Sequence, residues 1–273
     1  MTTPVLDGAV PYAATHRSHS GRTVIFLHAH PDDEAIFTAA TMRRLADRGA
    51  RVILVTATGG ELGEPLTPLA EGESISARRR VELEAAAACL GVDRLVLLGR
   101  RDSGMPGRPS ARHPLAFARG RVDALARRLA GLAEDESAEA IVHYDDQGIY
   151  GHPDHVAVHR VGVLAARMAG IRDYQATVDR DHLGRTAGTH VLDLASGGAR
   201  YGRTREEITL EIRADRSELD AKHAAMSAHA SQIAPTSLDP ASFPDGYARE
   251  WYVHDPTRTG PDTLAELAAA PQP

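Results

Sequence analysis

The sequence predicts an α/β protein with a Rossmann-like, mostly parallel sheet flanked by helices and a smaller C-terminal lobe that contains β-strands. Two observations support this prediction. As far as residue 169, short apolar runs typical of buried parallel strands alternate with stretches of helical spacing. Beyond that point the alternation weakens, and the next segments alternate apolar and polar residues, as half-buried strands do. Strands that alternate with helices imply right-handed crossovers between parallel neighbours.

The first 169 residues contain the regular alternation. The strands expected there are residues 23–27, 51–56, 94–98 and 140–144. The helices expected between and after them are residues 35–48, 79–90, 117–132 and 156–169. Gly49 and Gly91 stand where glycine ends a helix, and Ser76 is the predicted N-cap of the second helix. Residues 62–76 should form a long irregular loop, of the kind that often acts as a lid.

The remainder of the chain has weaker signals. Residues 189–194 and 207–212 are predicted strands, and residues 217–230 are a predicted helix. Residues 235–273 contain many prolines and glycines and are expected to be loop-rich, and residues 1–21 are expected to form a surface tail. Because no internal repeat or linker is visible, we expect a single domain spanning residues 1–273.

Composition narrows the class of protein. Hydrophobic residues make up 42% of the chain, which is enough for a sizeable core, and the formal net charge of −6 argues against nucleic acid as a partner. The single cysteine, Cys89, cannot form an internal disulfide, which favours a reducing compartment. No signal peptide is visible, and no stretch approaches the roughly 20 apolar residues of a membrane span. A cytoplasmic location is therefore expected, without membrane association.

The first candidate site follows the first predicted strand. Residues 30–34 read His-Pro-Asp-Asp-Glu and lie where that strand would turn into a helix. In open α/β sheets ligands bind at this edge. His30 and Asp33 are three residues apart and can point at one spot, which leaves Asp32 free to act. A carboxylate here could also merely cap the helix, and His28 on the same strand face is either a fourth ligand or, more in keeping with its position, a supporting group.

A second candidate site follows the fourth predicted strand. Residues 150–155 read Tyr-Gly-His-Pro-Asp-His and again precede a helical stretch. Two strand ends rich in His and Asp suggest one shared centre. A catalytic zinc site has three protein ligands and one open position, and His30, Asp33 and His155 would supply the three. Two imidazoles and one carboxylate suit Fe²⁺ as well as Zn²⁺.

Together these motifs resemble those of the LmbE-like (PIG-L) zinc N-deacetylases, which remove acyl groups from the 2-amino position of glucosamine-type sugars. The likeness runs from about residue 23 to residue 233. Residues 79–91 resemble the helix that follows the lid loop of the family, and residues 229–232, His-Ala-Ser-Gln, resemble a late family motif. Residues 101–105, Arg-Asp-Ser-Gly-Met, resemble the mycothiol branch, which includes the mycothiol deacetylase and the mycothiol conjugate amidase. The segment after Met105 and the C-terminal third differ from that branch.

The resemblance implies roles for individual residues. The implied zinc ligands are His30, Asp33 and His155. The implied catalytic groups are Asp32 as general base, a protonated His152 as general acid or oxyanion stabiliser, Asp154 as the partner of His152, and Tyr150 near the reacting carbonyl. The implied contacts to substrate hydroxyls are Arg79 and Asp102. Glu34 is expected to support the site, and His229 either supports it or is simply a polar helix end.

We therefore expect a zinc-dependent hydrolase that removes an N-acetyl group from a small glucosamine-type conjugate. The alternative with the same chemistry is an amidase that cleaves mycothiol S-conjugates. A third reading is a sugar-binding protein without catalysis, but that reading predicts the loss of Asp32 or of a ligand, and all four residues are present. The sequence predicts no oligomeric state.

Overall fold

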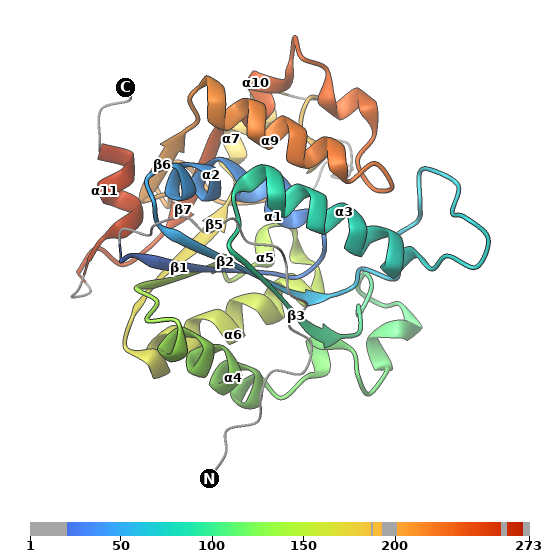
Figure 1. Ribbon diagram of the computed structural model, residues 1–273, viewed down its shortest axis with the longest axis horizontal. Helices are drawn as coiled ribbons and strands as arrows, with labels where there is room; N and C mark the ends of the chain where they lie inside the picture. Colours follow the sequence, from blue (N-terminus) through green and yellow to red (C-terminus); the bar gives the residue numbers. More distant parts are fainter. Residues whose placement is uncertain (1–20, 187, 193–200, 258–260, 270–273) are drawn as a thin grey trace.

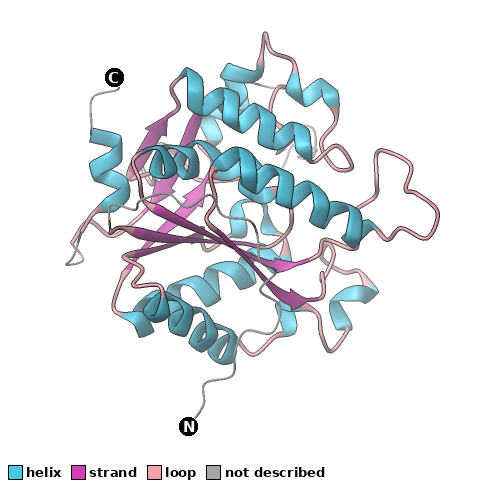
Figure 2. Cartoon of the chain, in the orientation of Figure 1, coloured by secondary structure: helices cyan, strands magenta, loops and turns pink. Residues whose placement is uncertain are grey.

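A computed structural model describes residues 21–186, 188–192, 201–257 and 261–269, and one seven-stranded sheet runs through its centre (Figures 1 and 2). The strand order is β3-β2-β1-β4-β5-β7-β6. The five parallel strands are β1 (Thr23–His28), β2 (Arg51–Thr58), β3 (Arg94–Arg100), β4 (Ala140–Tyr144) and β5 (Arg172–Thr177). The last two strands, β6 (Leu210–Arg213) and β7 (Arg249–Val253), pair antiparallel to each other, and β7 pairs antiparallel to β5.

Helices cover both faces of the sheet, as the parallel strands require. On one face lie α4 (Val122–Asp135) and α6 (Pro153–Ala169), which pack on each other (Figure 1). On the other face lie α1 (Asp33–Phe37), α2 (Ala39–Asp47), α3 (Ile75–Leu90) and α9 (Arg216–Ala228). The shorter helices are α5 (Gly148–Gly151), α7 (Arg180–Arg185), α10 (Phe243–Tyr247) and α11 (Thr263–Ala269). Strands β1 and β4 have no exposed residue because both of their faces are covered.

The position of the candidate site follows from the strand order. From β1 to β3 the chain adds strands toward one edge of the sheet, and from β4 to β5 it adds them toward the other edge, so the order reverses between β1 and β4. These two strands are paired, with Val24 opposite Ala140 and Phe26 opposite Val142. In doubly wound sheets the crevice at such a reversal, beyond the carboxyl ends of the strands, is where ligands bind. Residues 30–34 and 150–155 follow these two strands.

The α/β class and the mostly parallel sheet are confirmed, and the predicted β-containing C-terminal part is present. Its strands extend the main sheet instead of forming a sheet of their own. Two strands were not predicted. Strand β5 contains charged and amide side chains, so it lacks the apolar run expected of a buried strand. Strand β7 lies in the segment that was expected to contain only loops. The predicted strand at 189–194 is wrong for residues 189–192, which form a turn and the start of a helix, and residues 193 and 194 lie outside the described part.

The helix predicted at residues 35–48 is two helices, α1 and α2, that break at Thr38. The Thr38 hydroxyl bonds the His28 ring at 2.9 Å and the Glu34 carbonyl at 3.3 Å. The buried Glu250 carboxylate of β7 accepts the backbone N–H groups of Ala40 and Thr41. These bonds satisfy donors that a new helix leaves free, so a residue 210 positions away caps α2.

Other helix boundaries also differ from the predicted ones. Ser74, not Ser76, caps α3, because its side chain accepts the backbone N–H of Ala77. The helix predicted from residue 117 begins as a short 3-10 turn and becomes α-helical only at Val122, after Gly120. Gly91 ends α3 in the left-handed conformation (φ 72°), as predicted. Within the described residues, no helix has the length and apolar character that a bilayer crossing requires.

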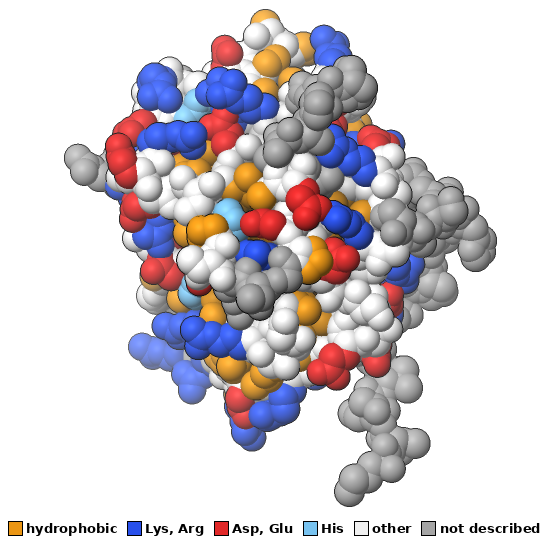
Figure 3. All heavy atoms as spheres, turned by 90° about the vertical axis from the view of Figure 1, so that its left-hand side faces the viewer, with side chains coloured by type: hydrophobic (Ala, Val, Ile, Leu, Met, Phe, Trp, Pro, Cys, Tyr) orange, Lys and Arg blue, Asp and Glu red, His pale blue; other side chains and the backbone are white. Residues whose placement is uncertain are grey.

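Acidic and basic side chains are interspersed over the face of the molecule shown in Figure 3, with apolar atoms exposed between them. This mixed surface accords with a net charge of only −6 in 273 residues.

Candidate active site

A cavity of about 350 Å³ opens at the reversal point between β1 and β4. This volume is at the lower end of the range that holds small ligands. The polar side chains that line it are His30, Asp32, Asp33, Arg79, Asp102, Tyr150, His152 and Gln232. The apolar side chains that line it are Ile36, Phe37, Leu62, Met105, Val191, Leu192 and Ile233. The structure therefore brings side chains of both motifs, with Arg79 and Asp102, to one cavity, while the fully buried His155 is not among the residues that line it.

Three possible metal-ligand atoms, from Asp33, His30 and His155, converge beside this cavity. The Asp33 Oδ2 atom lies 3.4 Å from Nδ1 of His30 and 3.3 Å from Nε2 of His155. Two ligand atoms bound at zinc distances around a tetrahedral ion lie about 3.3–3.4 Å apart, so this spacing suits a shared cation. One ring nitrogen each of His30, His152 and His155 also lie within 4.8 Å of one another. The distances from Asp33 Oδ2 to the two histidines match a tetrahedral site and support Asp33 as the third ligand.

The charge distribution also suits a cation. Burial disfavours a proton on His30, but the carboxylates of Asp102 and Asp154 outweigh it, and with Asp33 they raise the pKa of His30 well above its usual range. Burial likewise opposes ionisation of Asp33, yet His155 and His30 hold the pKa of that carboxyl well below its usual range. A divalent cation would satisfy the same carboxylates, so the residues present fit a metal ion.

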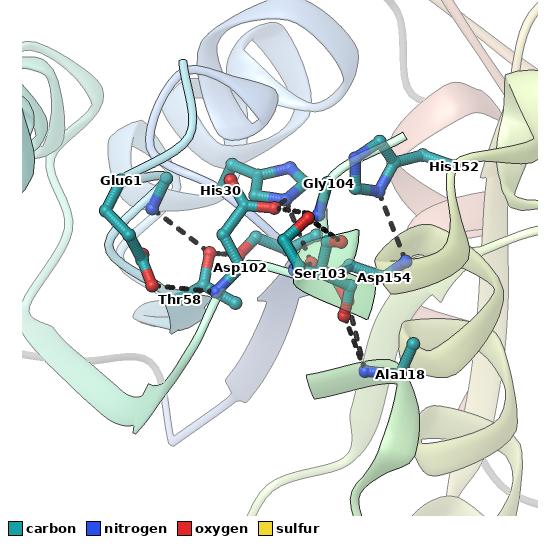
Figure 4. A network of polar contacts seen from close by, with 12 residues as sticks. His30, Thr58, Glu61, Asp102, Ser103, Gly104, Ala118, His152 and Asp154 are labelled. Carbon is teal, nitrogen blue, oxygen red and sulfur yellow. Dashed lines mark hydrogen bonds and ion pairs between the residues drawn. The ribbon is translucent and has the colours of Figure 1, made fainter. Parts of the chain in front are cut away.

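The carboxylate of Asp154 contacts His30, and only the backbone N–H of Asp154 bonds His152 (Figure 4). Its Oδ2 lies 3.3 Å from Nε2 of His30 and accepts the backbone N–H of Ser103 at 2.9 Å. Its Oδ1 accepts the Ser103 hydroxyl and the backbone N–H of Ala118. A carboxylate on the second nitrogen of a metal-binding histidine orients that ring. The predicted pairing of the Asp154 carboxylate with His152 is therefore wrong, because Asp154 is fully engaged elsewhere.

Ser103 was not predicted as part of the site. Its backbone and hydroxyl both hold Asp154, and it is fully buried. The signal available in the sequence was its position in the segment 101–105, next to Asp102. Asp102 itself lines the cavity; its Oδ1 accepts the N–H of Gly104 at 2.8 Å and lies 3.6 Å from Nε2 of His30.

His152 presents a neutral imidazole to the cavity. Its Nδ1 accepts the backbone N–H of Asp154 at 3.2 Å, which leaves the ring hydrogen on Nε2. Burial, helped by the neighbouring His30 and His155, lowers the pKa of His152 to about 3. This environment favours a neutral ring, which can donate one hydrogen bond through Nε2, and the protonated His152 that the resemblance implied stays a prediction.

Asp32 lies on the cavity with a strained backbone. Its φ of 112° is outside the regions that a residue with a side chain normally adopts, which costs on the order of 1–3 kcal/mol. Its carbonyl accepts the N–H groups of Ala35 and Ile36, which begins α1. Burial raises the pKa of Asp32 to about 6, although Arg79 opposes the rise. A carboxylate with a raised pKa is a better proton acceptor than an ordinary one.

Arg79 lies on α3, lines the cavity and binds the turn that carries Asp32. Its Nη2 lies 3.1 Å from Oδ2 of Asp32 and also donates to the carbonyl of Pro31, and its Nη1 donates to the carbonyl of Gly60 at 2.9 Å. A Cβ on Gly60 would lie 2.4 Å from this guanidinium, so only glycine leaves room for it. Arg79 therefore positions Asp32, and its predicted contact with substrate stays a prediction.

The second turn contains Tyr150, whose hydroxyl lies 3.3 Å from Nε2 of His155 and faces the cavity. Burial raises the pKa of Tyr150 well above its usual range, so the hydroxyl stays protonated and can donate a hydrogen bond. The residue before it, Ile149, has a left-handed φ of 64°. Asp145 stabilises this turn, because its Oδ1 accepts the N–H groups of Gln147 and Ile149.

His28 is not a ligand. Its Nδ1 bonds the Tyr144 hydroxyl and its Nε2 bonds the Thr38 hydroxyl, both at 2.9 Å. Because hydroxyl groups occupy both ring nitrogens, His28 can only support the site indirectly. It does so through Tyr144, whose ring stacks on His155 with centroids 4.4 Å apart.

Comparison of the sequence with known proteins identifies a family. The family profile PIG-L, described as GlcNAc-PI de-N-acetylase, matches residues 25–166. The chain is 40% identical over 237 residues to the 1D-myo-inositol 2-acetamido-2-deoxy-alpha-D-glucopyranoside deacetylase of Acidothermus cellulolyticus, covering 78% of this chain and 80% of that protein. It is 36% identical to the protein of the same name from Thermobifida fusca, covering 88% of this chain and 96% of that protein.

Solved structures show the same fold at lower identity. The A40926 pseudoaglycone deacetylase Dbv21 superposes with a TM-score of 0.61 at 18% identity, covering 90% of this chain and all of that one. The N,N'-diacetylchitobiose deacetylase from Pyrococcus horikoshii superposes with a TM-score of 0.55 at 21% identity, covering 86% of this chain and 84% of that one.

Proposed function

The chain belongs to the PIG-L family of de-N-acetylases, and on that premise we propose that it is a metal-dependent hydrolase that removes the N-acetyl group from a glucosamine-type sugar conjugate. One observation carries the proposal. A candidate base, Asp32, lies on the cavity next in sequence to Asp33, which with His30 and His155 offers three metal-ligand atoms at a spacing that suits a cation. This combination is what hydrolysis of an unreactive amide requires.

Asp33, His30 and His155 would hold the metal, and Zn²⁺ is the ion we propose, with Fe²⁺ as the alternative. Bound there, Zn²⁺ would lower the pKa of a water to about 7 and polarise the acyl carbonyl. Ser103 and Asp154 would keep the His30 ring in place through its second nitrogen.

The side chains of the chain would carry the proton transfers. Asp32 accepts a proton from the attacking water as the new C–O bond forms. His152 then donates a hydrogen bond through Nε2–H to the negative oxygen of the tetrahedral carbon, and the Tyr150 hydroxyl can donate a second one. As the C–N bond breaks, Asp32 returns its proton to the leaving amine, which gives acetate and the free amino sugar. One hydrogen-bond donor to such an oxygen contributes about 2.7–4 kcal/mol.

The substrate class comes from the relatives and from the cavity lining. Relatives at 36–40% identity are named as deacetylases of an inositol glycoside of N-acetylglucosamine. Asp102 supplies a buried acceptor that suits a sugar hydroxyl, and Gln232 supplies a second acceptor through its amide oxygen, because its Nε2 donates to Ser231. The apolar side chains Ile36 and Phe37, next to Asp33, give the methyl of an acetyl group a surface to pack on.

The test is release of acetate from this inositol glycoside and from simpler N-acetylglucosaminides by enzyme loaded with Zn²⁺ or, without oxygen, with Fe²⁺. We expect acetate and amine in equal amounts, loss of activity with a chelator, and recovery when metal is added back. If metal-loaded enzyme binds these sugars but releases no acetate from any of them, the protein is a binding protein and the proposal is wrong.

An amidase that acts on mycothiol S-conjugates is the second candidate. The observation that favours it is the apolar rim of the cavity, where Leu62 and Met105 remain 39% and 49% exposed. A thiol-linked apolar group could pack there. Faster cleavage of an S-conjugate amide than of the N-acetyl substrate in the same assay would establish this candidate.

A further inference from the structure

The structure contains a buried acidic–basic pair, Glu34 and His229, that touches the Asp32 turn but does not line the cavity. Both side chains are completely buried, and Nε2 of His229 lies 2.5 Å from Oε1 of Glu34. The two residues are 195 positions apart, and His229 is the C-cap of α9. Removing two ionisable side chains from water costs desolvation free energy, so we expect this pair to have a specific task.

Glu34 also binds the backbone of the strained residue. Its second oxygen, Oε2, accepts the N–H of Asp32 at 3.0 Å. An ionised carboxylate only accepts hydrogen bonds, so the hydrogen between Glu34 and His229 belongs to Nε2 of the histidine. Nδ1 of His229 is buried without a partner among the described residues, so Glu34 is the one polar side chain bonded to this ring.

The left-handed backbone of Asp32 needs such contacts to persist. Its φ of 112° is maintained only if the surroundings over-determine it. Its carbonyl is held by α1, the Pro31 carbonyl before it is held by Arg79, and its N–H is held by Glu34 alone. Without the Glu34 carboxylate, this peptide would be held only through the Pro31 carbonyl by Arg79, and the N–H of Asp32 would lose its acceptor. We expect the peptide then to rotate and to turn the Asp32 side chain with it.

We propose that Glu34 and His229 are positioning residues that hold the backbone of Asp32 in its strained conformation and thereby aim its carboxylate at the reacting water. His229 orients Glu34, and Glu34 orients Asp32. The proposal rests on the proposed role of Asp32 as general base. The segment that follows His229 is anchored beside the site, because the Ser231 side chain and backbone bind Glu82 of α3 and Gln232 lines the cavity.

The kinetic test uses four variants of the metal-loaded enzyme. For His229→Ala and Glu34→Ala we expect kcat to fall by up to about 100-fold, with KM and bound metal unchanged, because a displaced base affects only the chemical step. His229→Gln keeps a donor near the position of Nε2 and should recover most of kcat. The double variant Glu34→Ala/His229→Ala should be no slower than the worse single variant, because the two act in one chain.

Lys222→Met is the matched control. Lys222 lies on α9, whose C-cap is His229, is also buried and pairs with Glu250 at 2.8 Å, and within the described residues it makes no hydrogen bond or ion pair with a polar side chain of the cavity. We expect this variant to lower the melting temperature and leave the kcat of the folded enzyme unchanged. The proposal is overturned if His229→Ala behaves like this control, or if its loss of activity follows a loss of metal.

A crystal structure of the metal-loaded His229→Ala enzyme supplies a readout that does not depend on activity. We expect φ of Asp32 to leave the left-handed region and its carboxylate to turn from the cavity. If φ stays near 112° the proposal is wrong, whatever the rates show. Absence of acetate release by the unmutated enzyme would instead count against the proposed function and leave this structural outcome to decide the positioning.

Discussion

The two turns that build the site are alike in position and differ in what holds them. Each follows a central parallel strand and contains one left-handed residue that is not glycine, Asp32 in the first and Ile149 in the second. The first turn is held by side chains of distant helices, Arg79 of α3 and His229 of α9, the latter through Glu34. The second turn is held mainly by Asp145, at the end of its own strand.

The second turn also has support from the strands that follow. Asp145 accepts the Thr177 hydroxyl of β5 at 2.6 Å, and the carbonyl of Ile149 accepts the N–H of Gly202 at 2.8 Å. Gly202 needs its missing side chain, because a Cβ there would lie 2.1 Å from the carbonyl oxygen of Val178. The turn with the candidate base thus depends on side chains from two distant helices, whereas the turn with His152 and His155 is held by Asp145 next to its own strand and by contacts with Thr177 and Gly202.

The variant with the largest expected effect, His155→Ala, tests whether the two turns share one cation. His155→Ala removes the only predicted ligand of the second turn, and we expect loss of bound metal and no measurable acetate release. Metal content and activity measured on the same sample check this prediction. Full metal occupancy in the variant would mean that the first turn binds the ion without the second.

The next variant tests whether Asp32 of the first turn acts as a base or as a metal ligand. Asp32→Asn keeps the size of the side chain and removes its ability to take a proton, so we expect kcat/KM to fall by about 10²–10⁴. Bound metal should stay at the level of the unmutated enzyme. A fall in metal equal to the fall in rate would assign Asp32 to the ligands and contradict its role as base.

His152→Ala tests the neutral donor of the second turn. We expect kcat to fall by about 10²–10³, the typical cost of losing one donor to a developing negative oxygen. Because the structure indicates a neutral ring, His152→Gln, which keeps an N–H donor, should retain more activity than His152→Ala. Equal rates for the two variants would show that proton transfer, not hydrogen-bond donation, is the task of His152.

The smallest expected effect concerns the local support of the second turn. Asp145→Ala leaves the N–H of Gln147 and the buried N–H of Ile149 without this acceptor, which should lower the free energy of unfolding by about 1–3 kcal/mol. The matched control is Asp146→Ala, whose side chain is 60% exposed and should change stability by about 0.5 kcal/mol or less. Urea unfolding of both variants measures the difference. Equal losses would show that the second turn does not depend on Asp145.

Much of the fold could be predicted because it depends on local spacing. Apolar runs of five or six residues identified β1, β2, β3 and β4, and a left-handed glycine ended α3 where the pattern indicated. The predictions failed where distant partners override local preference. Glu250 divides the first helix in two by capping α2, and β5 carries polar residues that are satisfied only within the finished sheet.

The sequence by itself determined which chemistry is present, because His30, Asp33 and His155 stand at strand ends that a parallel sheet must bring together. Only the tertiary structure decided how these residues are used. It assigned Asp154 to His30 instead of His152, made Ser103 part of the support, and placed His229 against Glu34. The physical reason is that a side chain at a given position can bond any of several neighbours, and which neighbour is near depends on how segments more than a hundred residues apart pack together.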